Sequence, residues 1–313
     1  MRVLVTGGAG FIGSRVVKKL CDYGVTVRVF DLSPRTGDGV DYYQGSILDL
    51  GHLRSAMRDV DAVMHLAAVA DVKDVFEAPH YSEMVNVRGT ANVLEAMRLN
   101  GLSRMVYGST TWVYEAAEPD VVNESTPLGM PTHLYTATKL AGEYYCRSYA
   151  SLYGLEPTIL RYGIPYGPGA RPAGVIALFV QKALRGEALT IAGDGMQFRK
   201  FVYVDDLAEG NVLALKARAK NCTFNLDGVE KITIRQLAET VQKILGDVTI
   251  EYISARPGDF SGKDVQSDKA RGELGWIPET TLEEGIRQYI DWLQGRNREQ
   301  EERWAKVDKR LMM

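Results

Sequence analysis

Short apolar runs alternate with longer amphipathic segments along the first half of the chain. Most of the short runs are predominantly apolar and contain few polar residues, which is typical of strands buried on both faces. The longer segments place apolar residues at the spacing of a helix with one buried face. Strands are predicted at 2–6, 25–30, 40–44, 62–66, 104–108 and 157–161, and helices over the segment ending at 20 and at 48–59, 79–99 and 134–153. This alternation predicts a doubly wound α/β fold, with a parallel sheet covered by helices on both faces.

The rhythm changes after residue 165, where a loop rich in glycine and proline covers 167–172. Beyond it, strands are predicted at 189–191, 201–203, 223–226 and 249–253, and helices at 174–184, 205–216, 234–245 and 282–293. We expect residues 1–165, joined by about 200–226, to form the first domain, and 166–199 with 227–313 to form a smaller α/β lobe. The charged tail from residue 296 predicts a solvated helix.

Length and charge narrow the classes of protein that fit. The chain has 313 residues, which favours about two domains. Its formal net charge of −3 and pI near 5.9 provide no general basic field, so nucleic acid is not expected as a partner. The 3 cysteines are scattered and form no CxxC, which disfavours a disulfide framework and a zinc site and fits a reducing compartment.

The same reading predicts a cytoplasmic protein without a membrane partner. The first predicted strand begins at residue 2, which leaves no room for a signal peptide. No apolar run approaches the roughly 20 residues that a membrane-spanning helix needs. His65 has no second histidine or carboxylate at ligand spacing, so no metal is expected and His65 should pack at a strand end.

The clearest motif is the glycine-rich turn between the first strand and the first helix. Gly7 permits the turn, Gly10 lets the backbone approach a pyrophosphate, and Gly13 lets the helix pack closely on the sheet. The N–H groups at the helix start then face an anion. The second strand ends in Asp31, near the offset of about 20 residues at which an acid binds the adenine ribose. These residues predict a Rossmann-type domain that binds NAD rather than NADP, because Asp31 would repel a 2′-phosphate; Arg35 is the residue that could reverse this preference.

Tyr135 and Lys139 lie four residues apart on the predicted helix 134–153 and therefore share a face. The pKa of a free phenol is about 10, too high for a base at neutral pH. A neighbouring ammonium favours the phenolate, and lowering the pKa by about three units takes roughly 4 kcal/mol. Beside a dinucleotide fold, the pair predicts a general base and the cation that tunes it.

These residues belong to a set of motifs that covers nearly the whole chain. The set comprises 6–13, 31, 65–68, 86–90, 109–111 with 113–114, 135–139, 161–162, 166–168, 193–195, 199 with 201–206, and 256–259. With them the chain resembles the extended short-chain dehydrogenase/reductases, and within these the nucleotide-sugar epimerase/dehydratase group. The resemblance implies NAD as cofactor and a nucleotide sugar, most simply a UDP-hexose, as substrate.

The resemblance also implies a role for individual residues. Tyr135 is the expected general base, Lys139 binds the nicotinamide ribose and tunes Tyr135, and Thr110 hydrogen-bonds the reacting sugar oxygen. Ser109 is the adjacent alternative to Thr110. The residues implied in NAD binding are Gly7, Gly10, Phe11, Ile12, Gly13, Asp31, Ser46, Ile47, Leu66, Ala67, Ala68, Asn86, Tyr135, Lys139 and Tyr162. The residues implied in substrate binding are Thr110, Thr111, Trp112, Ile164, Arg171, Val175, Arg199, Arg256 and Asp259, with Arg199 and Arg256 as the clamp on the diphosphate.

The chain departs from the pattern of the galactose epimerases at several positions. Ile164 stands where those enzymes have an Asn that contacts the substrate, and Ala70 stands where one branch has a Lys against the nucleotide. Glu115 replaces a Gly, and Trp112 is far bulkier than the residue expected beside the sugar. Arg171, followed by a proline, instead resembles the uronate 4-epimerases, in which this Arg faces the sugar carboxylate.

The implied activity is 4-epimerisation of UDP-glucose/UDP-galactose or UDP-glucuronate/UDP-galacturonate through a transient 4-keto sugar. A 4-keto-sugar reductase that consumes NAD(P)H and a non-catalytic dinucleotide-binding protein are the alternatives. Dehydration and decarboxylation are disfavoured, because Thr111 and Trp112 stand where the enzymes for those reactions carry carboxylates. The resemblance further implies a homodimer, paired through the helices near 81–99 and 134–153.

Overall fold

A seven-stranded parallel sheet forms the centre of the computed structural model, which describes residues 1–33, 40–246, 248–255 and 262–311. The strands lie in the order β12-β7-β5-β4-β1-β2-β3. Their bounds are β1 Arg2–Thr6, β2 Thr26–Asp31, β3 Asp41–Gln44, β4 Ala62–His65, β5 Arg104–Thr110, β7 Glu156–Tyr162 and β12 Thr223–Leu226. The predicted doubly wound fold is confirmed. Because the chain runs from β1 outward through β2 and β3 and then returns to β4, the strand order reverses between β1 and β4, where such sheets bind ligands.

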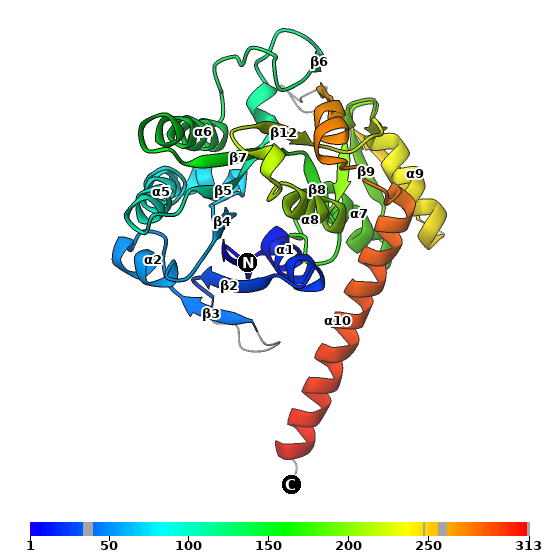
Figure 1. Cartoon of the computed structure of the whole chain (residues 1–313). Coiled ribbons are helices and arrows are strands. Elements are labelled where there is room, and N and C mark those ends of the chain that lie inside the picture. The colour runs from blue at the N-terminus through cyan, green and yellow to red at the C-terminus, as the bar shows by residue number, and fades with distance from the viewer. Residues whose placement is uncertain (34–39, 247, 256–261, 312–313) are drawn as a thin grey trace.

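Helices cover both faces of this sheet (Figure 1). On one face α1 (Phe11–Asp22) packs beside α8 (Val204–Leu213), and on the other lie α2 (Leu50–Ala56), α5 (Gly89–Leu99) and α6 (Leu134–Tyr153). Successive side chains of β1 point to opposite faces of the sheet. Val3 and Val5 therefore belong to the core under α1, and Leu4 belongs to the core under α2 and α5. Both faces of the sheet are therefore buried under helices, and a ligand can reach the sheet only at the ends of its strands.

A second group of elements follows β7 and surrounds its own hydrophobic core. Its helices are α7 (Val175–Leu184), α9 (Ile234–Leu245) and the first turns of α10 (Leu282–Leu311). Its strands form two-stranded sheets, in which β8 (Ile164–Tyr166) pairs with β11 (Phe201–Tyr203), β9 (Leu189–Ala192) with β14 (Ile250–Ile253), and β10 (Phe198–Arg199) with β13 (Ile232–Thr233). A further pair joins β15 (Asp264–Val265) to β6 (Val121–Val122). Within segment 200–226, α8 and β12 belong to the seven-stranded sheet and the helices that cover it. The strand β11 instead pairs with β8, because Phe201 and Tyr203 pack in the second core.

Three local features differ from the expected elements. The segment 79–99 is not one helix: α4 (Pro79–Glu83) and α5 are joined by a π-helical turn over Met84–Arg88. A short helix α3 (Val72–Glu77) precedes it, and further short turns lie at Thr111–Tyr114, Ala217–Ala219 and Ala270–Leu274. The helices predicted at 282–293 and from residue 296 form one continuous helix, α10, and Figure 1 shows its second half extending away from the rest of the chain, as expected for a solvated helix.

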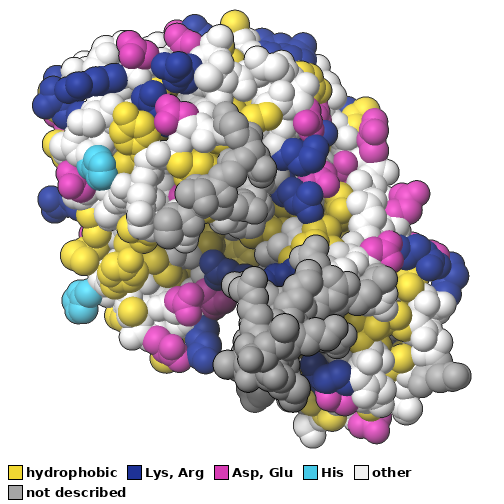
Figure 2. Space-filling model, turned by 90° about the horizontal axis from the view of Figure 1, so that it is seen from below, with side chains coloured by type: hydrophobic (Ala, Val, Ile, Leu, Met, Phe, Trp, Pro, Cys, Tyr) yellow, Lys and Arg dark blue, Asp and Glu magenta, His cyan; other side chains and the backbone are white. Residues whose placement is uncertain are grey.

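The surface carries both signs of charge. In the view of Figure 2, basic and acidic side chains of the described residues lie interspersed with apolar ones. Among the described helices, none combines the length and the apolar character that crossing a membrane requires.

Candidate active site

The glycine-rich turn lies where the strand order reverses, at the carboxyl end of β1. Gly7 has φ +72°, and a Cβ there would lie 2.6 Å from the backbone nitrogen of Ala67 in the loop after β4. A Cβ on Gly13 would collide with the carbonyl oxygen of Gly7. Gly10 begins α1 without any side-chain cap, so the first N–H groups of the helix, which include those of Phe11 and Ile12, are left for a ligand. A side chain at Gly7 or Gly13 would collide with neighbouring backbone, so glycine is required to form this turn, and the free N–H groups at the start of α1 fit a dinucleotide pyrophosphate.

Asp31 lies at the end of β2 and faces this turn. Its Oδ2 accepts a hydrogen bond from the Ala9 backbone N–H at 3.0 Å, and its Oδ1 accepts one from Ser33 at 2.9 Å. These bonds fix the carboxylate against the glycine loop, in the position expected for an adenine-ribose ligand. In the segment after β3, the Ser46 hydroxyl accepts a bond from the Leu48 N–H at 3.2 Å, and Ile47 is buried.

The loop after β4 is held by a buried hydrogen-bond chain centred on His65. The Thr90 hydroxyl donates to the Asn86 carbonyl at 2.6 Å, so it accepts from His65 Nε2 at 3.0 Å. His65 Nδ1 then accepts from the Thr6 hydroxyl at 2.7 Å. Burial and the nearby Lys139 charge lower the pKa of His65 to about 3, so the ring is neutral. His65 thus joins the ends of β1 and β4 to α5, and in the described part of the chain no group of His, Cys, Asp and Glu is arranged to hold a metal ion.

Asn86, in the π-helical turn, fixes the same loop to α6. Its Oδ1 accepts from the Val69 N–H at 2.8 Å, and its Nδ2 donates to the Val69 carbonyl at 2.9 Å and to the Thr138 hydroxyl at 3.0 Å. Thr138 in turn donates to the Tyr135 carbonyl at 2.8 Å. The side-chain amide is therefore satisfied within the protein, and Asn86 positions the loop that carries Leu66, Ala67 and Ala68 relative to Tyr135.

Tyr135 and Thr110 meet at the carboxyl end of β5. Thr110 lies close enough to the Tyr135 phenol to influence its pKa, and its Oγ1 accepts from the Trp112 N–H at 3.2 Å. Burial raises the pKa of Tyr135 to about 12, while the charge of Arg171 and the nearby Thr110 hydroxyl act to lower it. Arg171 was expected near the sugar from the resemblance, but its influence on Tyr135 had no signal in the sequence. Thr110, Tyr135 and Arg171 thus lie at the end of the candidate site that we call the reactive end.

Lys139 lies one turn after Tyr135 and is buried. Burial lowers the pKa of its ammonium to about 8. Its Nζ lies 4.4 Å from the centroid of the Tyr107 ring, a cation–π contact that holds the ammonium over β5. Tyr162, at the end of β7, is buried nearby and donates from its hydroxyl to Asn211 at 2.6 Å. The predicted catalytic pair therefore lies on the buried face of α6, between the ends of β5 and β7.

Ser109 faces a different environment from Thr110, because successive residues of β5 point to opposite faces. Its hydroxyl donates to Glu143 Oε1 at 2.7 Å. Glu143 also pairs with Arg161, whose Nε and Nη2 lie 2.9 Å and 2.7 Å from its two carboxylate oxygens. Arg161 Nη1 donates to Tyr114 at 2.6 Å. This buried network favours Thr110 over Ser109 as the hydroxyl at the site.

Sequence reasoning missed Glu143. The available signal was its spacing, since it follows Lys139 by one helical turn and so places a carboxylate on the buried face of α6.

Glu115 and Trp112 shape the wall beside the reactive end. Glu115 Oε1 accepts from the Thr132 N–H at 2.8 Å and from the His133 N–H at 3.3 Å, which fixes the chain entering α6. The Trp112 ring packs edge-on against His133, with centroids 5.5 Å apart. Thr111 lies between Thr110 and Trp112 in the same short helical turn. Glu115 therefore has a structural role in holding the start of the helix that carries Tyr135.

The other residues implied in substrate binding come from the second group of elements. Ile164 lies on β8 and Val175 is the first residue of α7. Arg199 lies on β10, and its Nη1 donates to the Phe198 carbonyl at 2.7 Å. Arg256 and Asp259, like Arg35, lie outside the described residues.

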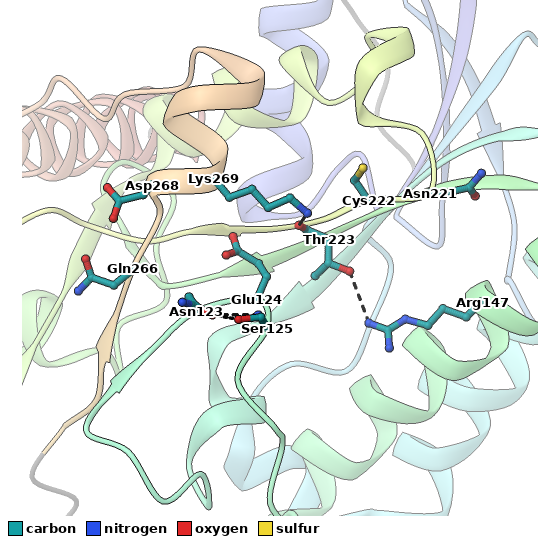
Figure 3. A pocket seen from close by; sticks show the side chains of 10 residues that line it. All are labelled: Asn123, Glu124, Ser125, Arg147, Asn221, Cys222, Thr223, Gln266, Asp268 and Lys269. Atoms are coloured by element: carbon teal, nitrogen blue, oxygen red, sulfur yellow. Dashed lines mark hydrogen bonds between the residues drawn. The ribbon is translucent and has the colours of Figure 1, made fainter.

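A separate cavity of about 640 Å³ lies beside the edge strand β12 (Figure 3). It is lined by Asn123, Glu124, Ser125, Arg147, Asn221, Cys222, Thr223, Gln266, Asp268 and Lys269. It shares no residue with the predicted site. Two of its lining groups satisfy the outer edge of β12, since Glu124 accepts from the Asn225 N–H at 2.7 Å and Lys269 donates to the Thr223 carbonyl at 3.0 Å. We therefore interpret the polar side chains that line this cavity as the groups that protect the outer edge of β12.

Comparison with known proteins agrees with this geometry. The sequence model of the NAD-dependent epimerase/dehydratase family matches residues 3–226. A putative UDP-glucose 4-epimerase of Methanocaldococcus jannaschii is 35% identical over 95% of this chain and 99% of its own length. A UDP-glucuronate 4-epimerase of Thermodesulfobacterium geofontis is 32% identical over 92% of this chain and 95% of its own.

The fold is shared as well. The crystal structure of UDP-glucose 4-epimerase with UDP-glucose from Thermotoga maritima superposes with a TM-score of 0.88 at 33% identity, covering 94% of this chain and 99% of that one. Other relatives are named as a decarboxylase and a dehydratase. The chain belongs to the NAD-dependent epimerase/dehydratase family, which confirms the resemblance seen in its motifs and NAD as the cofactor.

Proposed function

We propose that this enzyme interconverts the C4 epimers of a UDP-linked hexose or hexuronate through a 4-keto intermediate. The observation that carries the proposal is the placement of Thr110 at the end of β5, near Tyr135 and Lys139 on α6, at the same edge of the sheet as a glycine turn that fits a dinucleotide. The relatives named as UDP-glucose and UDP-glucuronate 4-epimerases support the substrate class.

Each residue at the reactive end has a distinct task in this reaction. Tyr135 removes the proton of the C4 hydroxyl and later returns it, while Thr110 holds the C4 oxygen within reach. Lys139 and Arg171 favour the phenolate form of Tyr135 by their positive charges. When bound, NAD would supply the hydride acceptor and donor for C4, and its nicotinamide would add a further positive charge beside the phenol. Bringing the pKa of Tyr135 from about 12 to near neutrality takes roughly 7 kcal/mol, which is why several cations are needed.

The residues beside Thr110 support epimerisation over elimination or decarboxylation. Loss of water across C5 and C6 needs a base at C5 and an acid at the C6 hydroxyl. The two positions after Thr110 are Thr111 and Trp112, which carry no carboxyl group. The nearest following acid, Glu115, is engaged with Thr132 and His133. A 4-keto sugar held here can therefore mainly take its hydrogen back at C4.

The two groups of elements would bind different ligands. Residues 1–165 with about 200–226 would hold NAD, and 166–199 with 227–313 would hold the nucleotide sugar, with Arg199 and Arg256 on the diphosphate. The asymmetry of the fold supports this, because the glycine turn and Asp31 belong to the large sheet while Arg199 lies on β10 of the smaller core.

The proposal is tested by incubating the purified protein with UDP-glucose, UDP-galactose, UDP-glucuronate, UDP-galacturonate and dTDP-glucose. Products are identified by NMR and mass spectrometry. We expect C4 epimers of the UDP sugars and NAD(H), not NADP(H), released on denaturation. Formation of a 4-keto-6-deoxy sugar, carbon dioxide from a UDP-uronate, or stoichiometric consumption of NADPH would contradict it.

We further propose that the enzyme is a homodimer. Large apolar side chains are exposed on α4, the π-helical turn, α5 and α6, namely Tyr81, Met84, Leu99, Tyr144, Tyr145, Leu152 and Tyr153. A second copy pairing its own α5 and α6 against them would cover this surface. Sedimentation should show a dimer at micromolar concentration, and a monomer alone would contradict the proposal.

A further inference from the structure

An ion pair crosses from the large sheet to the loop between β8 and α7. Arg171 Nη1 lies 3.1 Å from Asp71 Oδ2, with the arginine side chain 50% exposed and the aspartate side chain 27% exposed. Asp71 follows β4 and precedes α3, whereas Arg171 belongs to the glycine- and proline-rich loop. The contact therefore joins two loops that both border the predicted site.

The loop that carries Arg171 is held in place. Gly169 has φ +94°, and a Cβ there would lie 3.4 Å from the Phe11 ring of the glycine turn. Arg15 Nη2 donates to the Pro168 carbonyl at 3.5 Å. The backbone leading to Arg171 thus packs on the first turns of α1, and the contact with Asp71 orients its guanidinium.

Arg171 lies close enough to Tyr135 for its charge to stabilise the phenolate. If Tyr135 acts on the C4 hydroxyl, the C6 group is only two carbon–carbon bonds away from C4. The Arg171 loop packs on the glycine turn at the same edge of the sheet as Tyr135, so a sugar whose C4 lies at Tyr135 would carry its C6 group on the side of Arg171. A uronate would place its carboxylate beside this guanidinium, and a hexose would place a neutral hydroxymethyl group there.

Asp71 already supplies the carboxylate at this position. Its side chain caps α3 by accepting from the Lys73 N–H at 2.9 Å, and its other oxygen pairs with Arg171. The Lys73 bond, together with Arg171, holds the pKa of Asp71 below its usual range, so the group is ionised at neutral pH. The cap fixes the carboxylate, and a second anion at Arg171 would meet a like charge that cannot move away freely.

We infer that Asp71 selects against uronates by occupying Arg171, so that the site prefers sugars with a neutral C6 group. The inference rests on the proposed function and narrows its substrate to the UDP-glucose/UDP-galactose pair. The discrimination arises from repulsion, because a substrate carboxylate must either displace Asp71 from Arg171 or share the guanidinium with it. A neutral hydroxymethyl group leaves the ion pair intact.

Asp71→Asn tests the inference while preserving the helix cap, since Asn caps helices as well as Asp does. We expect wild-type kcat/KM for UDP-galactose to exceed that for UDP-galacturonate by at least about tenfold, and the variant to reduce this ratio by at least about tenfold. UDP-glucuronate should also bind the variant more tightly in calorimetry. Asp74→Asn, in the exposed first turn of the same helix, is the matched control and should change neither quantity.

The outcomes separate this inference from the proposed function. If the wild type epimerises neither UDP-hexoses nor UDP-uronates, the proposed function fails and the inference with it. If the wild type epimerises a UDP-sugar but prefers the uronate, or if Asp71→Asn changes the ratio no more than Asp74→Asn, the proposed function stands and the role of Asp71 is overturned.

Discussion

Two stretches of α6 bury charged groups in opposite ways. The first contains Tyr135 and Lys139, whose pKa values burial shifts to about 12 and about 8. The next turn contains Glu143, which accepts hydrogen bonds from Ser109 and from both arms of Arg161. Among the described residues, the first stretch therefore has shifted pKa values and no ion pair, whereas the carboxylate of the second is fully ion-paired. The first is a site that a ligand completes, and the second is the scaffold that keeps its residues in place.

Removing the scaffold carboxylate should have the largest effect. Glu143→Leu leaves the Arg161 guanidinium buried and unpaired, and we expect the free energy of unfolding to fall by about 3–5 kcal/mol. Denaturant unfolding measures this. The control is Arg147→Gln. Arg147 is 51% exposed and lies 3.4 Å from Glu143, farther than the buried Arg161 at 2.7 Å, so losing it should lower the free energy of unfolding by less than about 1 kcal/mol. Equal effects of the two variants would show that the buried pair is not the stabilising element.

Changing the site should show the reverse behaviour. Tyr135→Phe removes the phenol that we propose as the general base, so kcat should fall at least about 10²-fold, equivalent to about 2.7 kcal/mol. Stability and NAD content should stay near the wild-type values, because the ring is retained. Near-normal turnover by this variant would exclude Tyr135 as the base.

The contrast also separates what a sequence can and cannot predict. The glycine turn, Asp31, and the pair of Tyr135 and Lys139 are local patterns with fixed spacing, so they indicate their chemistry directly. The contacts of Glu143 depend on β5 and β7, and no local pattern encodes them. The same holds for the Asp71–Arg171 pair, which only the folding of two distant loops brings together.

Helix boundaries show a similar limit. The apolar period predicted a continuous helix over 79–99, but the side chain of Asn86 bonds to Val69 and Thr138, and the backbone there forms a π-helical turn. The spacing of apolar residues alone does not reveal a π-helical turn, because hydrogen bonds to distant parts of the chain stabilise it.

Arg199 extends the comparison to the substrate end. Arg199→Ala should weaken UDP-sugar binding by about 1.5–3 kcal/mol, the range for hydrogen bonds to charged groups, and leave NAD content unchanged. The same result is expected for Arg256→Ala. Calorimetric titration with UDP measures it, and a loss of NAD with unchanged UDP affinity would place these residues on the wrong ligand.

The smallest effect concerns pH. Removing the Arg171 charge raises the pKa of Tyr135, so less phenolate is present at neutral pH and activity begins at a higher pH. In Arg171→Gln we expect the acid limb of the kcat/KM profile to move upward by about one unit or less. Arg185→Gln, which loses only a surface pair with Glu187, is the control. An acid limb that stays in place would remove Arg171 from the account of Tyr135.

The central claim is that the hydrogen removed from C4 returns to C4 and that C5 is never deprotonated. Its most direct test is ¹H NMR of UDP-galactose formed from UDP-glucose by the wild-type enzyme in D₂O. The account predicts protium at both C4 and C5 of the product and an intact C6 hydroxymethyl group. Deuterium at C5, or a 4-keto-6-deoxy product, would contradict it.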